Sequence, residues 1–179
     1  MKATNLTTEY LNNPIGIDIV KPHLFWNCEG GVKQTAYQVV AKVNDEIVFD
    51  SGKVTSSSMI CVYDGKTLQS RDIIVWSVIL WDENDVQGEA SEASFEIGLL
   101  NKEDWSAKWI SGDYKPKARK QALAPYLGKA PKREEVDYFC KSFELKSIKK
   151  GRLYITTCGV YEVFINEKRV GEVVMAPGY

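Results

Sequence analysis

QTAYQVVAKVNDEIVFD, residues 34–50, is the stretch of sequence that decides the fold. Within it, one face of 34–43 collects Tyr37, Val39, Ala41 and Val43. This spacing is the period of a β-strand that is buried on one side. Asn44 and Asp45 follow, and both residue types tolerate a positive φ, so they favour a two-residue turn into a second strand over 46–50. The stretch therefore predicts a β-hairpin.

Further short apolar segments lie on the C-terminal side of this hairpin. SMICVY at 58–63 and EASFEI at 92–97 are predicted strands, and IIVWSVILW at 73–81 is the most apolar of the set. In that last segment Trp76, Val78 and Leu80 should face a core, while the opposite face is partly covered. Short strands with turn residues between them are typical of an antiparallel sandwich, for which residues 1–100 suffice.

The second half of the chain begins with a change of composition. Residues 101–136 contain a joint, NKEDWSAKWI at 101–110, and then a tract over 111–135 that is rich in Lys, Arg, Ala and Pro. That tract has no periodicity, so we expect an exposed loop.

Strands are predicted again at 137–145, 152–157 and 160–165, where apolar residues lie on both faces. Asn166 and Glu167 then favour a tight turn. A type I′ turn would hold Glu167 at a positive φ with some strain, and a longer loop is the alternative. Residues 137–179 are thus predicted to be the first strands of a second, truncated β-sandwich.

Composition and charge exclude several classes of function. The net charge is −1, from 23 basic and 24 acidic residues, which offers no electrostatic footprint for nucleic acid or an anionic membrane. The first residues contain no apolar segment of a secretory signal, and the longest apolar run, 73–80, is too short to span a bilayer. We therefore expect a cytoplasmic location, with no nucleic-acid or membrane partner.

The cysteines give no sign of a metal site. Cys28, Cys61, Cys140 and Cys158 are far apart in the sequence, none belongs to a CxxC pair, and His23 is the one histidine. Zinc ligands cluster more closely than this. We expect four reduced thiols rather than disulfides, and no metal or cofactor.

Candidate catalytic groups are few. Asp82, Glu83 and Asp85 lie in one loop, and a glycosidase needs two carboxylates across a sugar, but their closeness in sequence favours a solvated turn. His23 has no partner identifiable from the sequence, so a structural or exposed role is favoured over that of a general base. No catalytic residue is predicted.

The five tryptophans are the remaining candidates for binding. Exposed aromatic rings can stack on sugars, so a carbohydrate platform is one hypothesis. Trp26 and Trp76 lie in apolar segments and are predicted to be core, whereas Trp105 and Trp109 flank the joint and are predicted to pin two domains together. Packing is favoured over sugar binding for all of them, including Trp81.

An ordered series of motifs runs along nearly the whole chain. It comprises NPIGID at 13–18, PHLFW at 22–26, QTAYQV at 34–39, FDSGKV at 49–54, VYDGKTLQS at 62–70, the segment 75–100, DWSAKWI at 104–110, FCKSFEL at 139–145 and the segment 152–179. In this order and spacing the motifs resemble the N-terminal region of bacterial α-L-rhamnosidases. Each motif is weak by itself, and it is the series that is specific.

The resemblance implies a fibronectin-type-III-like module over 1–100 and the start of a jelly-roll-like domain near Asp104. It also implies that terminal α-L-rhamnose is released, with inversion, in a later helical barrel that holds both catalytic carboxylates. No residue of this chain matches a catalytic or sugar-binding position of that family. The chain by itself is predicted to be inactive, with the barrel of its parent as partner and a rhamnosylated glycoside as the parent's substrate.

Three functions compete. The first is a non-catalytic accessory region of an α-L-rhamnosidase; the alternatives are a stand-alone carbohydrate-binding module and a structural spacer. In each case the strands of 137–179 leave an uncovered sheet face, which we expect to bury itself against the first domain or a second copy of the chain.

Overall fold

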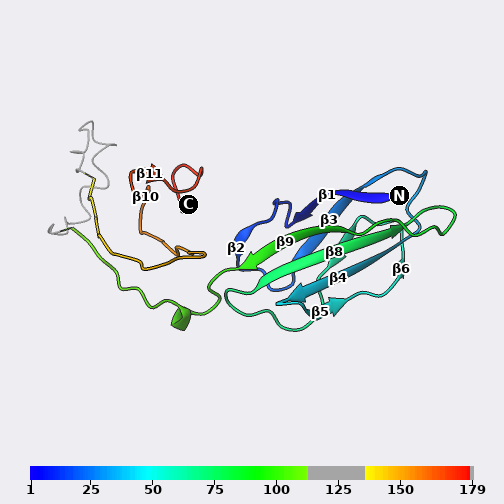
Figure 1. Cartoon of the computed structure of the whole chain (residues 1–179), viewed down its shortest axis with the longest axis horizontal. Helices are drawn as coiled ribbons and strands as arrows, with labels where there is room; N and C mark the ends of the chain where they lie inside the picture. Colours follow the sequence, from blue (N-terminus) through cyan, green and yellow to red (C-terminus); the bar gives the residue numbers. More distant parts are fainter. Residues whose placement is uncertain (113–135, 178–179) are drawn as a thin grey trace, which may run out of the picture. The chain divides into compact units, whose positions relative to one another are not determined.

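The computed structural model describes residues 1–112 and 136–177, and it divides the chain into two units, Met1–Ile110 and Ser111–Tyr179 (Figure 1). Most of the basic tract predicted to be an exposed loop, residues 113–135, lies outside the described residues.

The first unit is built almost entirely of strands. They are β1 (Lys2–Thr8), β2 (Ile15–Ile17), β3 (His23–Glu29), β4 (Ala36–Val43), β5 (Glu46–Asp50), β6 (Val54–Thr55), β7 (Ile60–Val62), β8 (Ile73–Trp81) and β9 (Ser91–Ile97), followed by the 3-10 helix η1 (Lys102–Asp104). The hairpin of 34–50 and the strands predicted at 58–63, 73–81 and 92–97 are confirmed, within one or two residues at their ends.

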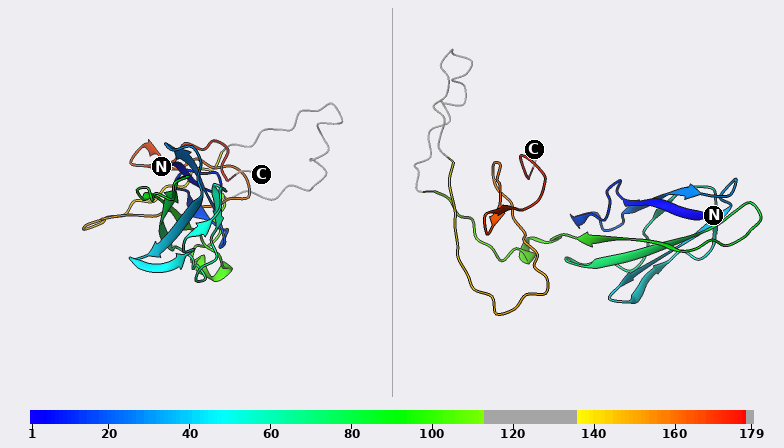
Figure 2. Two further views of the ribbon diagram at one scale, coloured as in Figure 1. Left: turned by 90° about the vertical axis from the view of Figure 1, so that its right-hand side faces the viewer. Right: turned by 45° about the horizontal axis from the view of Figure 1, so that its top comes forward.

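These strands form two sheets. One has the order β1-β3-β7, and the other has the order β2-β9-β8-β4-β5 with β6 also paired to β4. Figure 2 shows β1 and β3 of the first sheet, in blue, on one side of β8 and β9 of the second sheet, in green. Pairing is antiparallel except between β2 and β9, which run parallel, and this pair departs from the antiparallel expectation. Two sheets packed face to face in this order make an immunoglobulin-like β-sandwich.

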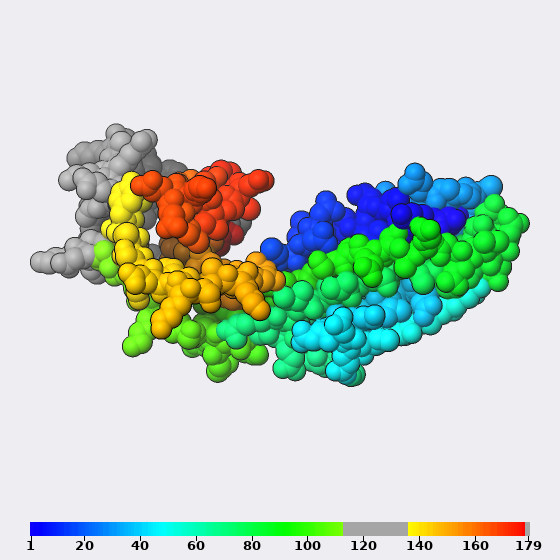
Figure 3. Space-filling model, viewed as in Figure 1, coloured from blue at the N-terminus to red at the C-terminus, as the bar shows by residue number. Residues whose placement is uncertain are grey.

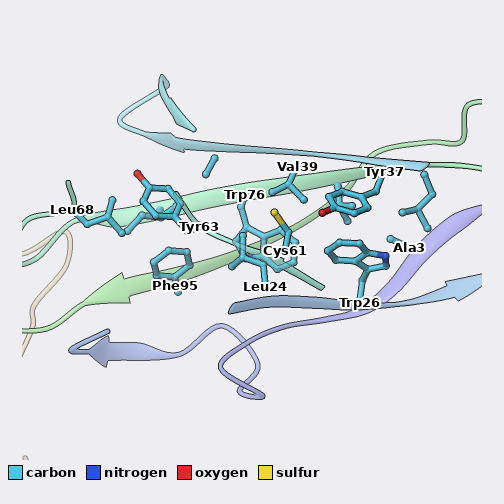
Figure 4. Packing of buried hydrophobic residues seen from close by; sticks show 14 of the residues in the cluster. Ala3, Leu24, Trp26, Tyr37, Val39, Cys61, Tyr63, Leu68, Trp76 and Phe95 are labelled. Carbon is cyan, nitrogen blue, oxygen red and sulfur yellow. The ribbon is translucent and has the colours of Figure 1, made fainter. Parts of the chain in front are cut away.

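The core lies between the two sheets and follows from the alternation in the strands. Leu24 and Trp26 point inward from β3, and Trp76, Val78 and Leu80 point inward from β8, as the sequence predicts. Figure 4 shows several of these side chains in the space between the sheets, with Trp76 near Leu24 and Cys61. The opposite face of β8 is mixed, since Val75 is exposed and Trp81 is buried.

A buried carboxamide joins three segments of this core. Gln34 Oε1 accepts hydrogen bonds from Trp26 Nε1 at 2.9 Å and from the Cys28 thiol at 3.2 Å. Its Nε2 donates to the carbonyl oxygens of Ser56 and Ser58. The side chain is therefore fully used, which is what burial of a carboxamide requires.

The predicted two-residue turn between β4 and β5 is present. Asn44 and Asp45 have φ values of 48° and 67°, both in the left-handed region that a type I′ turn needs. Register is set by this turn, which pairs Val43 with Glu46. Asp45 is not a glycine, so its conformation carries a modest strain.

The joint after the sandwich belongs to the first unit. The Asp104 carboxylate accepts hydrogen bonds from Ser70 Oγ at 2.5 Å and from the backbone N–H of Asn101 at 3.0 Å. The Arg71 guanidinium donates to the Asp104 carbonyl oxygen at 3.1 Å. The first unit consequently extends to Ile110 and includes the joint, while the boundary of the sandwich itself at residue 100 stays a prediction.

The second unit is far less regular in its described part. Residues 136–177 contain only the strands β10 (Phe164–Ile165) and β11 (Lys168–Arg169), and the strands predicted at 137–145 and 152–157 are not paired there. A strand is stable only when its backbone groups find a neighbouring strand. Asn166 and Glu167, at φ 48° and 67°, make a two-residue turn, so the longer loop is not formed.

No residue among 136–177 is buried. Large apolar side chains are exposed throughout this range, among them Tyr138, Phe143, Ile148, Phe164 and Val173. This part of the chain therefore has the apolar composition of a β-domain without a core of its own.

Candidate functional site

The acidic loop after β8 uses its carboxylates to hold its own structure. Asp82 Oδ1 accepts hydrogen bonds from the backbone N–H groups of Asn84 and Val86, both at 2.9 Å. Glu83 Oε2 accepts from the N–H groups of Val32 and Lys33, and the Val32 bond is the leading reason why the pKa of Glu83 is lowered.

Asp85 belongs to a different contact in the same loop, because its carboxylate pairs with the Lys53 ammonium at 2.5 Å. The Lys53 nitrogen also lies 4.7 Å from the centre of the Trp81 ring. These arrangements stabilise loops and give no pair of carboxylates that face each other across a space for a sugar.

His23 has a partner that the sequence did not indicate. Glu9 Oε1 lies 2.6 Å from the His23 backbone nitrogen, which donates to it, and 3.0 Å from the ring nitrogen Nδ1. The backbone bond from His23 is the leading cause that lowers the pKa of Glu9 below its ordinary value. The result is an ionised carboxylate and an imidazole side by side on the outer surface of the sheet β1-β3-β7.

Two aromatic rings lie beside this pair. The Phe25 ring stacks on the Tyr10 ring, with 4.3 Å between ring centres and 25° between ring planes, and it also lies 6.1 Å from the His23 ring. Tyr10 is 77% exposed. We call Glu9, Tyr10, His23 and Phe25 the aromatic platform, and of its members only His23 is a candidate from sequence.

The sequence gives little signal for the rest of the platform. Glu9 and Tyr10 form a two-residue turn at φ 50° and 64°, although neither residue type favours a positive φ. The turn is closed by hydrogen bonds in both directions between the backbones of Thr8 and Leu11. A strand that outwardly alternates His23 and Phe25 is the one feature that could have indicated the site.

The tryptophans divide between core and surface. Trp26 and Trp76 are buried, as predicted, and Trp81 is buried beneath Lys53. Trp105 is 38% exposed and Trp109 is 73% exposed within the first unit. That these two pin two domains together stays a prediction.

The thiols of the first unit are poor nucleophiles. Burial raises the pKa of both Cys28 and Cys61, so both remain protonated at neutral pH. Cys140 and Cys158 are exposed in the second unit, and all four cysteines are free.

Residues 1–112 and 136–177 hold no group of three or more His, Cys, Asp or Glu side chains that could bind a metal ion. Over the same two ranges, no helix has both the length and the apolar character needed to cross a membrane.

The sandwich matches a known protein family. The family described as "Rha78A-like, N-terminal immunoglobulin domain" matches residues 3–101, which contain the strands of the two sheets except for Lys2, the first residue of β1. The chain belongs to this family. A second family model, "Alpha-L-rhamnosidase N-terminal domain", matches residues 146–179 in the second unit.

Relatives of this Rha78A-like chain are named as α-L-rhamnosidases. One from Formosa agariphila is 36% identical over 99% of this chain, and one from an Alteromonas species is 32% identical over 94%. The chain spans 20% and 19% of their respective lengths, or about a fifth.

Solved structures agree with this assignment. The α-L-rhamnosidase of Streptomyces avermitilis, solved with L-rhamnose, shares 36% identity and a TM-score of 0.56 over 62% of this chain and 12% of its own. The enzyme of Aspergillus terreus, at 23% identity, covers 99% of this chain and 20% of its own with a TM-score of 0.69, which shows a shared fold.

Proposed function

We propose that this chain is the non-catalytic N-terminal region of an α-L-rhamnosidase, in which an immunoglobulin-like module precedes the start of a second β-domain. The observation that carries the proposal is the order of the two family matches, with the sandwich at 3–101 and the rhamnosidase N-terminal domain at 146–179. The lengths of the relatives support it, because this chain accounts for only about a fifth of each.

The physical state of the second unit supports the same function. Its described residues expose apolar side chains that are normally buried in a β-domain, such as Phe143 and Phe164. Covering such surface contributes about 25 cal/mol for each Å² removed from water. Further strands and the catalytic barrel of a parent chain would provide that cover, and they are the proposed partners.

Catalysis is assigned to the parent and not to residues of this chain. The acidic side chains described above hold loops, and burial keeps the Cys28 and Cys61 thiols protonated. The parent's proposed substrate is a glycoside with a terminal α-L-rhamnose, cleaved with inversion by carboxylates outside this sequence. The four free cysteines also accord with the proposed cytoplasmic location, where thiols are kept reduced.

A chimera tests the proposal. The corresponding N-terminal fifth of the Formosa agariphila α-L-rhamnosidase is replaced by residues 1–179, and release of nitrophenol from 4-nitrophenyl α-L-rhamnopyranoside is measured. We expect the chimera to retain activity, while an enzyme from which the N-terminal fifth has been deleted loses solubility or activity. Residues 1–179 by themselves should release no nitrophenol.

A matched chimera with Trp76→Ala serves as the control. Trp76 is fully buried, so this change should unfold the sandwich and lower the yield of soluble enzyme. The proposal is wrong if residues 1–179 turn over the substrate by themselves, or if the folded chimera is no more soluble or active than the deleted enzyme.

A further inference from the structure

The aromatic platform lies on the outer face of the smaller sheet, on the side opposite the core. His23 and Phe25 point outward from β3 while Leu24 between them is buried. Their partners in β7 are Val62 and Ile60, which share this outer face. Figure 3 shows the N-terminal segment, in dark blue, on the surface of the first unit.

The turn that holds the Tyr10 ring in place has a strained backbone. Consecutive positive φ values at Glu9 and Tyr10 are strained for residues with a side chain, and such strain persists only where surrounding contacts outweigh it. Here the backbone bonds between Thr8 and Leu11, and the bond from Glu9 N–H to the His23 carbonyl oxygen, fix the turn. Phe25 supports one face of the Tyr10 ring, so the opposite face is presented to solvent.

Glu9 and His23 are the polar members of the platform: Glu9 directly precedes Tyr10 in the turn, and the His23 ring lies 6.1 Å from the Phe25 ring that supports Tyr10. The Glu9 carboxylate accepts hydrogen bonds, and the His23 imidazole, 47% exposed as a side chain, offers a further nitrogen. A pyranose sugar has an apolar face of C–H groups, which stacks on an aromatic ring, and a rim of hydroxyl groups, which bond to polar side chains. We propose that the aromatic platform is a binding site for a neutral pyranose, with Tyr10 as the stacking surface and Glu9 and His23 as hydrogen-bonding groups.

The size and charge of the platform favour a sugar over other occupants. A specific protein interface needs about 800 Å² from each partner, with about 20–30 residues a side, whereas the platform is centred on one ring. The ionised Glu9 disfavours sugar acids. A flat site of this kind has no enclosing walls, so we expect weak binding, with a dissociation constant of about 1 mM.

Calorimetric titration of residues 1–179 tests the site, with methyl α-L-rhamnopyranoside and methyl β-D-glucopyranoside as separate probes. Saturable binding of either probe is expected. Tyr10→Ala should weaken it about tenfold, and Tyr10→Phe, which keeps the ring, by less than about threefold. Tyr138→Ala is the matched control, because it removes an exposed tyrosine from the second unit, and should leave binding unchanged.

The proposed site is independent of the proposed rhamnosidase function. A chain that fails in the chimera can still bind sugar, and a chain that restores activity in the chimera can lack sugar binding. Tryptophan fluorescence checks that each variant is folded. The inference is overturned if neither pyranoside binds with saturation, or if folded Tyr10→Ala binds as well as the unaltered chain.

Discussion

At the scale of single residues, Gln34 has the widest consequences. Its carboxamide bonds to Trp26 and Cys28 on β3 and to two carbonyl oxygens between β6 and β7. Gln34 is only 4% exposed, so water cannot replace these partners. A buried polar group that loses its partner costs roughly 1–3 kcal/mol.

Gln34→Leu is therefore expected to lower the free energy of unfolding by about 3 kcal/mol, because Trp26 Nε1 and two carbonyl groups lose their partners together. Urea unfolding followed by tryptophan fluorescence measures the change. Gln38→Leu is the control, since Gln38 bonds to Asp50 at an exposed position, and its effect should be within about 0.5 kcal/mol. Equal midpoints for the two variants would contradict this account of Gln34.

Glu9 should make the free energy of unfolding depend on pH in the acid range. Its folded-state pKa lies below the ordinary 4.5, so the stability that it contributes is present above that value and is lost as the pH falls through the lowered pKa. Glu9→Gln does not titrate. The difference in unfolding free energy between the two proteins should be constant near neutral pH and should shrink in acid.

Urea unfolding at a series of pH values from neutral to acid measures this difference. A difference that stays constant through the acid range would show that Glu9 has no shifted pKa. The sequence could not predict this contact, because Glu9 and His23 are brought together by pairing of β1 with β3 and not by closeness along the chain.

At the scale of elements, the type I′ turn between β4 and β5 is a position where a single substitution should raise the free energy of unfolding. Asp45 holds φ at 67°, where glycine is unstrained. Asp45→Gly creates the Asn-Gly pair that this turn favours, and we expect it to stabilise the first unit by about 0.5–1 kcal/mol. Thermal unfolding monitored by circular dichroism measures the gain.

Asp45→Ala is the comparison for this turn, because alanine keeps a Cβ at the same φ. It should be less stable than Asp45→Gly. If the two variants unfold at the same temperature, strain at Asp45 is not what limits the hairpin.

Strands were predictable from sequence where alternation was strong and turns were marked. β4, β5 and β8 meet both conditions, and their pairing follows from the register that turn and pattern impose. β1 was missed because its pairing with β3 is irregular between Thr4 and Thr7, which breaks the period. β2 was missed because it has three residues and pairs in parallel with a distant strand.

The aromatic platform, a proposed binding site, shows the same limit of sequence-based prediction. A pattern along the chain can mark a strand face. The stack between Tyr10 and Phe25, however, depends on the turn at Glu9 and Tyr10, and neither of these two turn positions holds a glycine or an asparagine that would predict a positive φ. The aromatic residues that the sequence does mark, the tryptophans, lie in the core or near the joint.

At the scale of the whole molecule, the two units should differ in how they behave in solution. The first has a continuous core between its sheets, whereas residues 136–177 have none. We expect residues 1–110 to be monomeric at all concentrations and residues 1–179 to self-associate as concentration rises, because exposed apolar side chains such as Phe143 and Val173 seek cover.

Sedimentation velocity over a range of concentrations measures this difference in self-association. As a control for folding, both proteins should show the same urea midpoint for unfolding of the first unit. A concentration-independent monomer of residues 1–179 would contradict the expectation. The hydrogen bonds that Ser70 and Asn101 donate to the Asp104 carboxylate tie the joint to the sandwich, and they leave no mark on the periodicity of the sequence.

The single histidine of the chain is a member of the aromatic platform. In a preparation purified without a histidine tag and exchanged into D2O, the imidazole Hε1 proton of His23 gives the one histidine Hε1 resonance of the chain, so that signal needs no isotope labelling to be identified. His23 thus provides a spectroscopic reporter within the proposed binding site, and its resonance should shift in proportion to the fraction of the protein that has a sugar bound there.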